Sequence, residues 1–180
     1  MKKIIIFLLS LLVIGVSVGA VFYIVLNEKA EKTDLKKEID FKNCSYNIQG
    51  KDIQLKDGYS EEEIAPGSAS KLITRYFGNE LRGDFDGDGL SDTAFLITQN
   101  SGGSGTFYYL TVALSSNMGC KGTNAILLGD RIAPQTTGYE DGKIVVNYAD
   151  RGSGEPMTSR PSIGVSRYFE IKDGILVEIK

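Results

Sequence analysis

The distribution of hydrophobic and polar residues divides the chain into an apolar start and a longer mixed part. After Lys2 and Lys3, residues 4–26 form a run of 23 uncharged and mostly apolar positions. As an α-helix such a run is about 34 Å long, enough to cross a hydrocarbon core of roughly 30 Å. We therefore predict that residues 1–26 form an N-terminal signal anchor, with one transmembrane helix that holds the protein in the cell membrane.

The same run also has features of a cleavable signal peptide. Val18 and Ala20 make a weak cleavage pattern, and cleavage there would give a secreted protein with the apolar residues 21–26 at its new N-terminus. We favour retention, because cleavage would leave those apolar residues as the new N-terminus. We predict a cytoplasmic N-terminus and an extracytoplasmic C-terminal domain, because a short basic head before an apolar run is the layout of a secretory signal. Gly15 and Gly19 are four residues apart, the spacing at which small residues let two membrane helices pack as a weak homodimer. Glycine is also frequent in membrane helices that do not dimerise.

Beyond the apolar run the pattern is polar and then strand-like. Residues 27–43 contain ten charged side chains and are interpreted as a spacer, and residues 44–180 as one folded domain. The chain after residue 26 has 18 basic and 23 acidic residues, a formal charge of −5. This charge argues against nucleic acid as a partner.

Short runs of β-branched and aromatic residues, separated by Gly, Asp and Asn, predict a mainly β fold. Two Asp-Gly pairs, at 141–142 and 173–174, are hairpin signals, and we expect a single antiparallel β domain. Residues 68–77 fit either a helix or a strand, and we interpret them as a strand. No internal repeat is present, which argues against a propeller. The other predicted strands are residues 92–99, 106–114, 124–128, 143–148, 164–171 and 175–179.

Composition narrows the chemistry. The chain has no His, so catalytic triads and dyads that depend on imidazole, and His-ligated zinc, are excluded. Cys44 and Cys120 are the only cysteines, and the sequence leaves open whether they form a disulfide or two buried thiols.

One loop, residues 84–92, carries the spacing of a cation site. Calcium takes six to eight oxygen ligands, and carboxylates at alternate positions of a tight loop supply them. Gly89 permits the chain reversal, and the backbone carbonyl of Leu90 is a further ligand in this arrangement. Position 12 is Phe95 instead of the Glu of an EF-hand, so the loop is of another kind. The predicted Ca²⁺ ligands are Asp84, Asp86, Asp88, Leu90 and Asp92.

The loop resembles the calcium loops of FG-GAP and VCBS-type repeats, in which a DxDxDGxxD segment leads into a β-strand; the likeness covers residues 83–97. A wider set of stretches is similar to an uncharacterised family of exported or membrane-anchored bacterial proteins, some of which carry a module similar to lysozyme inhibitors. The likeness implies an exported β domain and no particular activity. These stretches are residues 65–70, 74–80, 103–109, 128–136 and 146–151.

Other candidate sites are weaker. The glycine-rich residues 101–105 lack the Gly-Lys-Ser/Thr ending of a phosphate loop and are interpreted as a hairpin loop. Residues 150–161 form a polar loop that either contacts a partner or is simply solvated. No spacing brings two carboxylates together among Glu140, Asp141, Asp150 and Glu155.

We therefore expect a non-enzymatic, calcium-binding domain with a structural or binding role at the cell surface, and an unidentified surface ligand or protein as its partner. The alternatives are an inhibitor of an exogenous lytic enzyme, which would present a protruding loop, and a carboxylate-dependent hydrolase.

Overall fold

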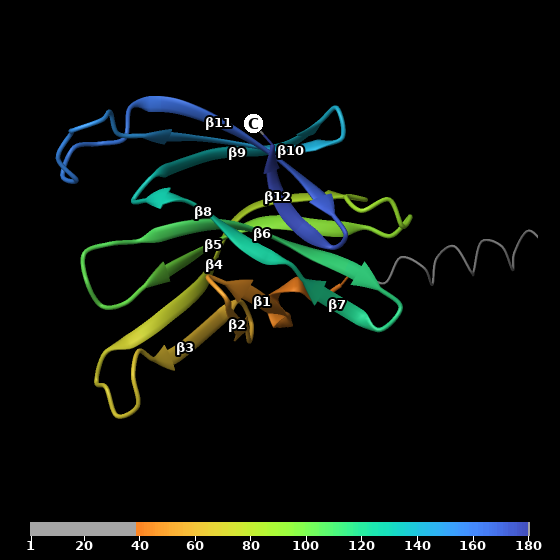
Figure 1. Ribbon diagram of the computed structural model, residues 1–180, viewed down its shortest axis with the longest axis horizontal. Coiled ribbons are helices and arrows are strands. Elements are labelled where there is room, and N and C mark those ends of the chain that lie inside the picture. The colour runs from red at the N-terminus through yellow and green to blue at the C-terminus, as the bar shows by residue number, and fades with distance from the viewer. Residues whose placement is uncertain (1–38, 180) are drawn as a thin grey trace, which may run out of the picture. The chain divides into compact units, whose positions relative to one another are not determined.

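The computed structural model describes residues 39–179, which form two β-sheets and one short 3₁₀ turn, η1 (Phe41–Asn43) (Figure 1). The predicted anchor, with its glycine pair and its cleavage pattern, lies outside these residues. No helix of the described part has the length and hydropathy needed to span a bilayer. The strands are β1 (Ser45–Ile48), β2 (Lys51–Gln54), β3 (Tyr59–Glu63), β4 (Lys71–Gly83), β5 (Asp92–Asn100), β6 (Phe107–Ser116), β7 (Gly119–Gly122), β8 (Asn124–Asp130), β9 (Ala133–Glu140), β10 (Lys143–Asp150), β11 (Ile163–Lys172) and β12 (Ile175–Ile179).

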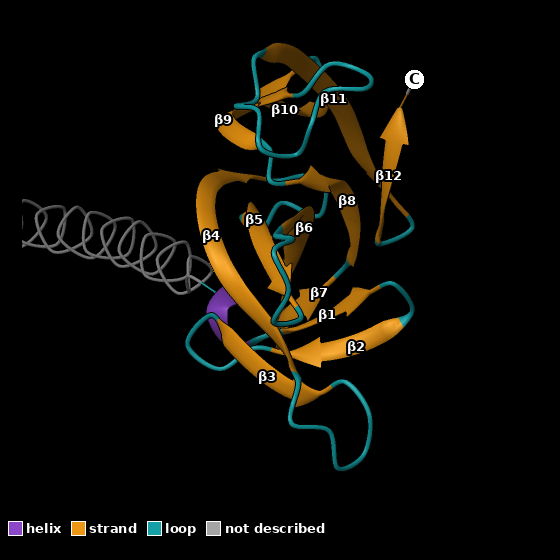
Figure 2. Ribbon diagram, turned by 90° about the vertical axis from the view of Figure 1, so that its left-hand side faces the viewer, coloured by secondary structure: helices purple, strands orange, loops and turns teal. Residues whose placement is uncertain are grey.

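The larger sheet has eight strands and curls into a nearly closed barrel. Its order is β2-β1-β8-β6-β5-β4-β3, and β7 pairs with β6 beside this path. Figure 2 shows the curve that β4 makes around the side of the barrel. Two irregularities in the pairing of β4 with β5, on either side of Gly78, produce this curve, because extra residues in one strand bend it. The outermost strands, β2 and β3, meet through the ion pair of Lys51 with Glu62, at 2.5 Å.

The smaller sheet is antiparallel, with the order β12-β11-β10-β9. Its β9–β10 and β11–β12 hairpins turn at the predicted Asp-Gly pairs. Asp141 and Gly142 have φ of 50° and 76°, and Asp173 and Gly174 have φ of 51° and 74°. A two-residue hairpin turn with positive φ at both positions matches the twist of its strands, so both turn predictions are confirmed.

Two hydrophobic cores share the central strands β5 and β6. Along β5, Phe95 and Ile97 point into the barrel, whereas Ala94 and Leu96 face the smaller sheet. Successive side chains of a strand alternate between its faces, so a strand between two cores is apolar at nearly every position. This explains why residues 92–97 are all buried.

A disulfide joins the start of the barrel to β7. Cys44 and Cys120 are bonded, with their Cα atoms 5.9 Å apart, which answers the question that the sequence left open. Next to this bond, a Cβ placed on Gly122 would lie 2.1 Å from the carbonyl oxygen of Ser45, so only glycine fits there. Disulfides persist mainly in oxidising compartments, and this one suggests an extracytoplasmic domain.

The mainly β prediction is confirmed, and residues 71–77 do lie in a strand, β4. The expectation of one purely antiparallel domain was too simple. The strands form two sheets, and β1 pairs with β8 in parallel. A parallel pair needs a long crossover connection, which the chain from β2 to β7 supplies. Ile39 and Phe41, in the predicted spacer, are buried in the barrel, so the folded part begins before residue 44.

Candidate metal centre

The loop between β4 and β5, residues 84–91, carries three exposed carboxylates that converge. Oxygen atoms of Asp84, Asp86 and Asp88 all lie within 4.8 Å of one another. Gly87 and Gly89 follow Asp86 and Asp88 and have φ of 82° and 85°, a backbone conformation that residues with a side chain rarely adopt. The glycines therefore allow the tight winding of the loop that turns all three aspartate side chains to the same side.

Backbone amides of the loop hold these carboxylates in place. The amides of Gly87 and Gly89 donate to Asp84, at 2.8 and 2.9 Å. The amide of Asp88 donates to Asp86 at 3.2 Å, and the amide of Leu90 donates to Asp88 at 2.7 Å. Short polar side chains make such local bonds readily, and here they preform the cluster that the aspartate spacing predicts.

Asp92 occupies a different environment from the other three aspartates. Its side chain is fully buried, and its two oxygens accept hydrogen bonds from the amides of Phe85, at 2.9 Å, and Ser115, at 2.8 Å. Burial raises the pKa of the Asp92 carboxyl, these two hydrogen bonds lower it in part, and the charges of Asp86 and Asp88 raise it. Asp92 thus ties the loop to β6, and the group of three does not include it.

Both ends of the loop are anchored in the protein. Phe85 is buried between the sheets, with its ring centroid 5.3 Å from that of Tyr139 on β9. At the other end, the hydroxyl of Ser115 donates to the carbonyl of Ser91. Asp84, Asp86 and Asp88 nevertheless remain exposed to solvent, open to an ion from outside.

The arrangement suits a hard cation. Three close carboxylates repel one another in the absence of a counter-charge, and a divalent cation offsets that repulsion. Carboxylate and carbonyl oxygens are the ligands that Ca²⁺ and Mg²⁺ prefer. The Asp84, Asp86 and Asp88 cluster can therefore hold a metal ion.

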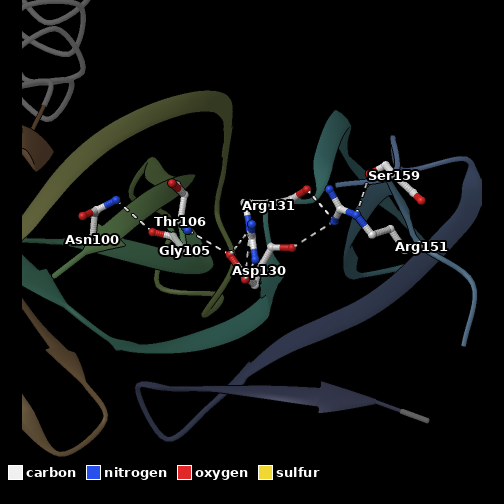
Figure 3. Close-up of polar contacts among 7 residues, drawn as sticks. All are labelled: Asn100, Gly105, Thr106, Asp130, Arg131, Arg151 and Ser159. Atoms are coloured by element: carbon white, nitrogen blue, oxygen red, sulfur yellow. Dashed lines mark hydrogen bonds and ion pairs between the residues drawn. The ribbon is translucent and has the colours of Figure 1, made fainter. Parts of the chain in front are cut away.

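The other polar candidates have structural roles. In Figure 3, the guanidinium of Arg151 donates to the carbonyls of Ser159, at 2.7 Å, and Arg131, at 3.0 Å, so it fixes residues 150–161 against the end of β8. Asp130 accepts hydrogen bonds from Arg131 and from the amide of Thr106. Although burial alone raises the pKa of Asp130, these bonds and the nearby arginine charges lower it overall.

The four other acids considered for catalysis are divided between the two ends of β10. Glu140 and Asp141 lie at its start, whereas Asp150 and Glu155 lie at and beyond its end. An eight-residue strand separates its ends by about 25 Å. Residues 101–105 connect β5 and β6, as the hairpin-loop interpretation predicted.

Comparisons with known proteins give no further guide to the site. The chain matches no protein-family model, no curated protein and no solved structure. The likeness to FG-GAP and VCBS-type loops thus remains a prediction from the sequence.

Proposed function

We propose that this protein is a calcium-binding β domain with a structural or binding role at the cell surface, held there by residues 1–26. The convergence of Asp84, Asp86 and Asp88 on one anchored, exposed loop is the observation that carries the proposal. The Cys44–Cys120 disulfide supports an exterior location. The proposal assigns the domain no catalytic role, and its partner is an unidentified surface ligand or protein.

Calcium fits this loop better than magnesium does. Magnesium requires near-ideal octahedral geometry with bonds of about 2.0 to 2.1 Å, whereas calcium accepts six to eight oxygens at about 2.3 to 2.6 Å. The proposed ligands are the three clustered aspartates, the carbonyl of Leu90 and Asp92. Each Asp92 oxygen already accepts one N–H and retains a second lone pair for the ion.

One observation supports the alternative function, an inhibitor of an exogenous lytic enzyme. The connection between β3 and β4 projects from the barrel in Figure 2, with Ile64 half exposed at its base. Hydrogen bonds from Gly67 to Glu63 and from Ser68 to Ala65 hold it in shape. A preformed projecting loop is what an inhibitor of a lytic enzyme needs in order to enter a cleft.

The calcium proposal is tested by calorimetry and thermal melts of the full chain in chelator, Ca²⁺ or Mg²⁺. For an affinity of about 10⁻⁴ M and about 1 mM calcium, binding to the folded state alone stabilises it by roughly 1.4 kcal/mol, or about 3 to 6 °C. Asp86→Asn should lose most of this shift, since it removes one ligand charge. Asp141→Asn, in an exposed hairpin turn, is the matched control and should keep it.

Equal melting temperatures in chelator and in millimolar calcium, with no heat of binding, would leave the loop as an acidic turn and end the calcium proposal. Protease added to intact cells tests the location separately. We expect removal of the C-terminal domain, and full protection until lysis would reverse the proposed orientation.

A further inference from the structure

The barrel has two weak seams, and both border the same segment. We call residues 39–55, which comprise η1, β1 and β2, the N-terminal arm. On one side β2 meets β3 through the Lys51–Glu62 ion pair, with no strand ladder between them. On the other side β1 pairs with β8 through two residue pairs, whereas β5 and β6 pair through seven. The arm is therefore joined to the rest of the barrel wall by a much shorter strand pairing than the one that joins β5 to β6.

The arm fills the barrel with large side chains. The rings of Phe41 and Tyr46 lie 5.0 and 5.4 Å from the ring of Phe95, centroid to centroid. Ile48 and Ile53 are buried in the same core, with exposed fractions of 3% and 1%. If the arm moves outward, the apolar interior of the barrel becomes exposed to solvent.

The disulfide joins the arm to β7, next to the seam between β1 and β8. Cys44 stands at the start of β1 and is buried, whereas Cys120 on β7 is partly exposed. With the bond closed, the arm can move only as far as this crosslink to β7 allows. Of the two cysteines Cys120 is the more exposed residue, so a reductant approaches the bond from the side of β7.

We propose that the Cys44–Cys120 disulfide is a redox latch on the N-terminal arm, opened by a dithiol reductant. A thiolate of the dithiol attacks the Cys120 sulfur, the bond between the two sulfurs breaks, and Cys44 leaves as a thiolate that takes up a proton. The second thiol of the reductant then attacks the mixed disulfide and releases Cys120 as a thiol. The dithiol is oxidised to a cyclic disulfide and the protein gains two thiols, so electrons and protons balance.

Reduction should act on the arm more than on the rest of the domain. The bond closes a chain segment of about 77 residues, and loss of such a crosslink changes an opening equilibrium by up to about 10³-fold in the chain-entropy description. Part of that change is a general loss of stability, because global unfolding also becomes more favourable without the crosslink. The remainder belongs to the arm, because local opening of the arm becomes free while the smaller sheet keeps all its pairings.

Hydrogen exchange of the full chain tests the latch. Amide protection is measured in the oxidised protein, in protein reduced by a dithiol, and in the Cys44→Ala, Cys120→Ala double variant. The readout is the protection of β1 and β2 relative to that of β10, which lies in the smaller sheet. We expect this ratio to fall at least about tenfold in both forms that lack the disulfide.

An unchanged ratio overturns the latch, whether both regions lose protection equally or neither does. Complete loss of protection in β10 overturns it as well, since the bond would then hold the whole domain together instead of the arm. Chelator is present in every sample, so the outcome does not depend on calcium binding.

Discussion

Replacing Gly122 with alanine tests how closely β7 approaches β1. A Cβ at this position would lie 2.1 Å from the carbonyl oxygen of Ser45 and 2.6 Å from the nearest ring carbon of Tyr46. Non-bonded carbon atoms prefer separations of about 3.5 to 4.0 Å, so the strands would have to separate by at least about 1 Å. They have little freedom to do so, because Cys44 and Cys120 are bonded beside this contact.

The expected loss of stability follows from that clash. Extra methylene groups in a packed core cost about 1 to 3 kcal/mol, and a backbone contact that cannot relax belongs at the upper end. For a domain of 141 described residues, about 3 kcal/mol corresponds to a decrease of roughly 10 °C in melting temperature.

The assay is a thermal melt of the oxidised full chain and of two variants. Gly138→Ala, also in a strand, is the control, since no heavy atom lies within 4 Å of its added Cβ. Its melting temperature should change by no more than the equivalent of about 1 kcal/mol. If the Gly122→Ala and Gly138→Ala variants have the same melting temperature, the close approach of β7 and β1 described above is wrong.

Two further substitutions test other contacts. Asn124→Ala removes a side-chain amide that bonds both the N–H and the C=O of Leu176, each at 2.9 Å, and should cost about 1 to 3 kcal/mol in urea denaturation; an unchanged midpoint would show that the smaller sheet does not need this link. Burial, and then the hydrogen bond to Glu80 and its charge, raise the pKa of Tyr76 to about 12. The folded state therefore keeps this proton at a pH where the unfolded chain loses it, and stability should fall as pH rises from about 10 to 12. Tyr76→Phe should make that fall shallower, and equal slopes for the two proteins would contradict the assignment.

The strands that could be predicted from the sequence are those whose own residues carry the signal. β10 and β12 are rich in β-branched and aromatic residues, and an Asp-Gly turn precedes each of them. β3, with the sequence YSEEE, and β9, with a proline and few apolar residues, were missed. Both are edge strands with much exposed surface, so their pairing partners determine their conformation more than their hydrophobicity does.

The candidate site divides in the same way. Asp84, Asp86 and Asp88 cluster because of local spacing, which a sequence displays directly. The hydrogen bond between Asp92 and Ser115 joins residues 23 positions apart, and no local sequence pattern predicts it. The Cys44–Cys120 bond is likewise a long-range contact, set by the approach of two strands instead of by composition.

The disulfide also determines how the domain transmits mechanical force. Tension applied between residues 39 and 179 passes from Cys44 through the sulfur atoms to Cys120, so residues 45–119 lie off the loaded path. The extensible part then consists of residues 39–44 and 120–179, at most about 230 Å when drawn out, against about 490 Å for the reduced domain. The acidic loop lies within the bypassed segment, so its bonds to Ser115 of β6 are not loaded while the strands beyond Cys120 are pulled apart.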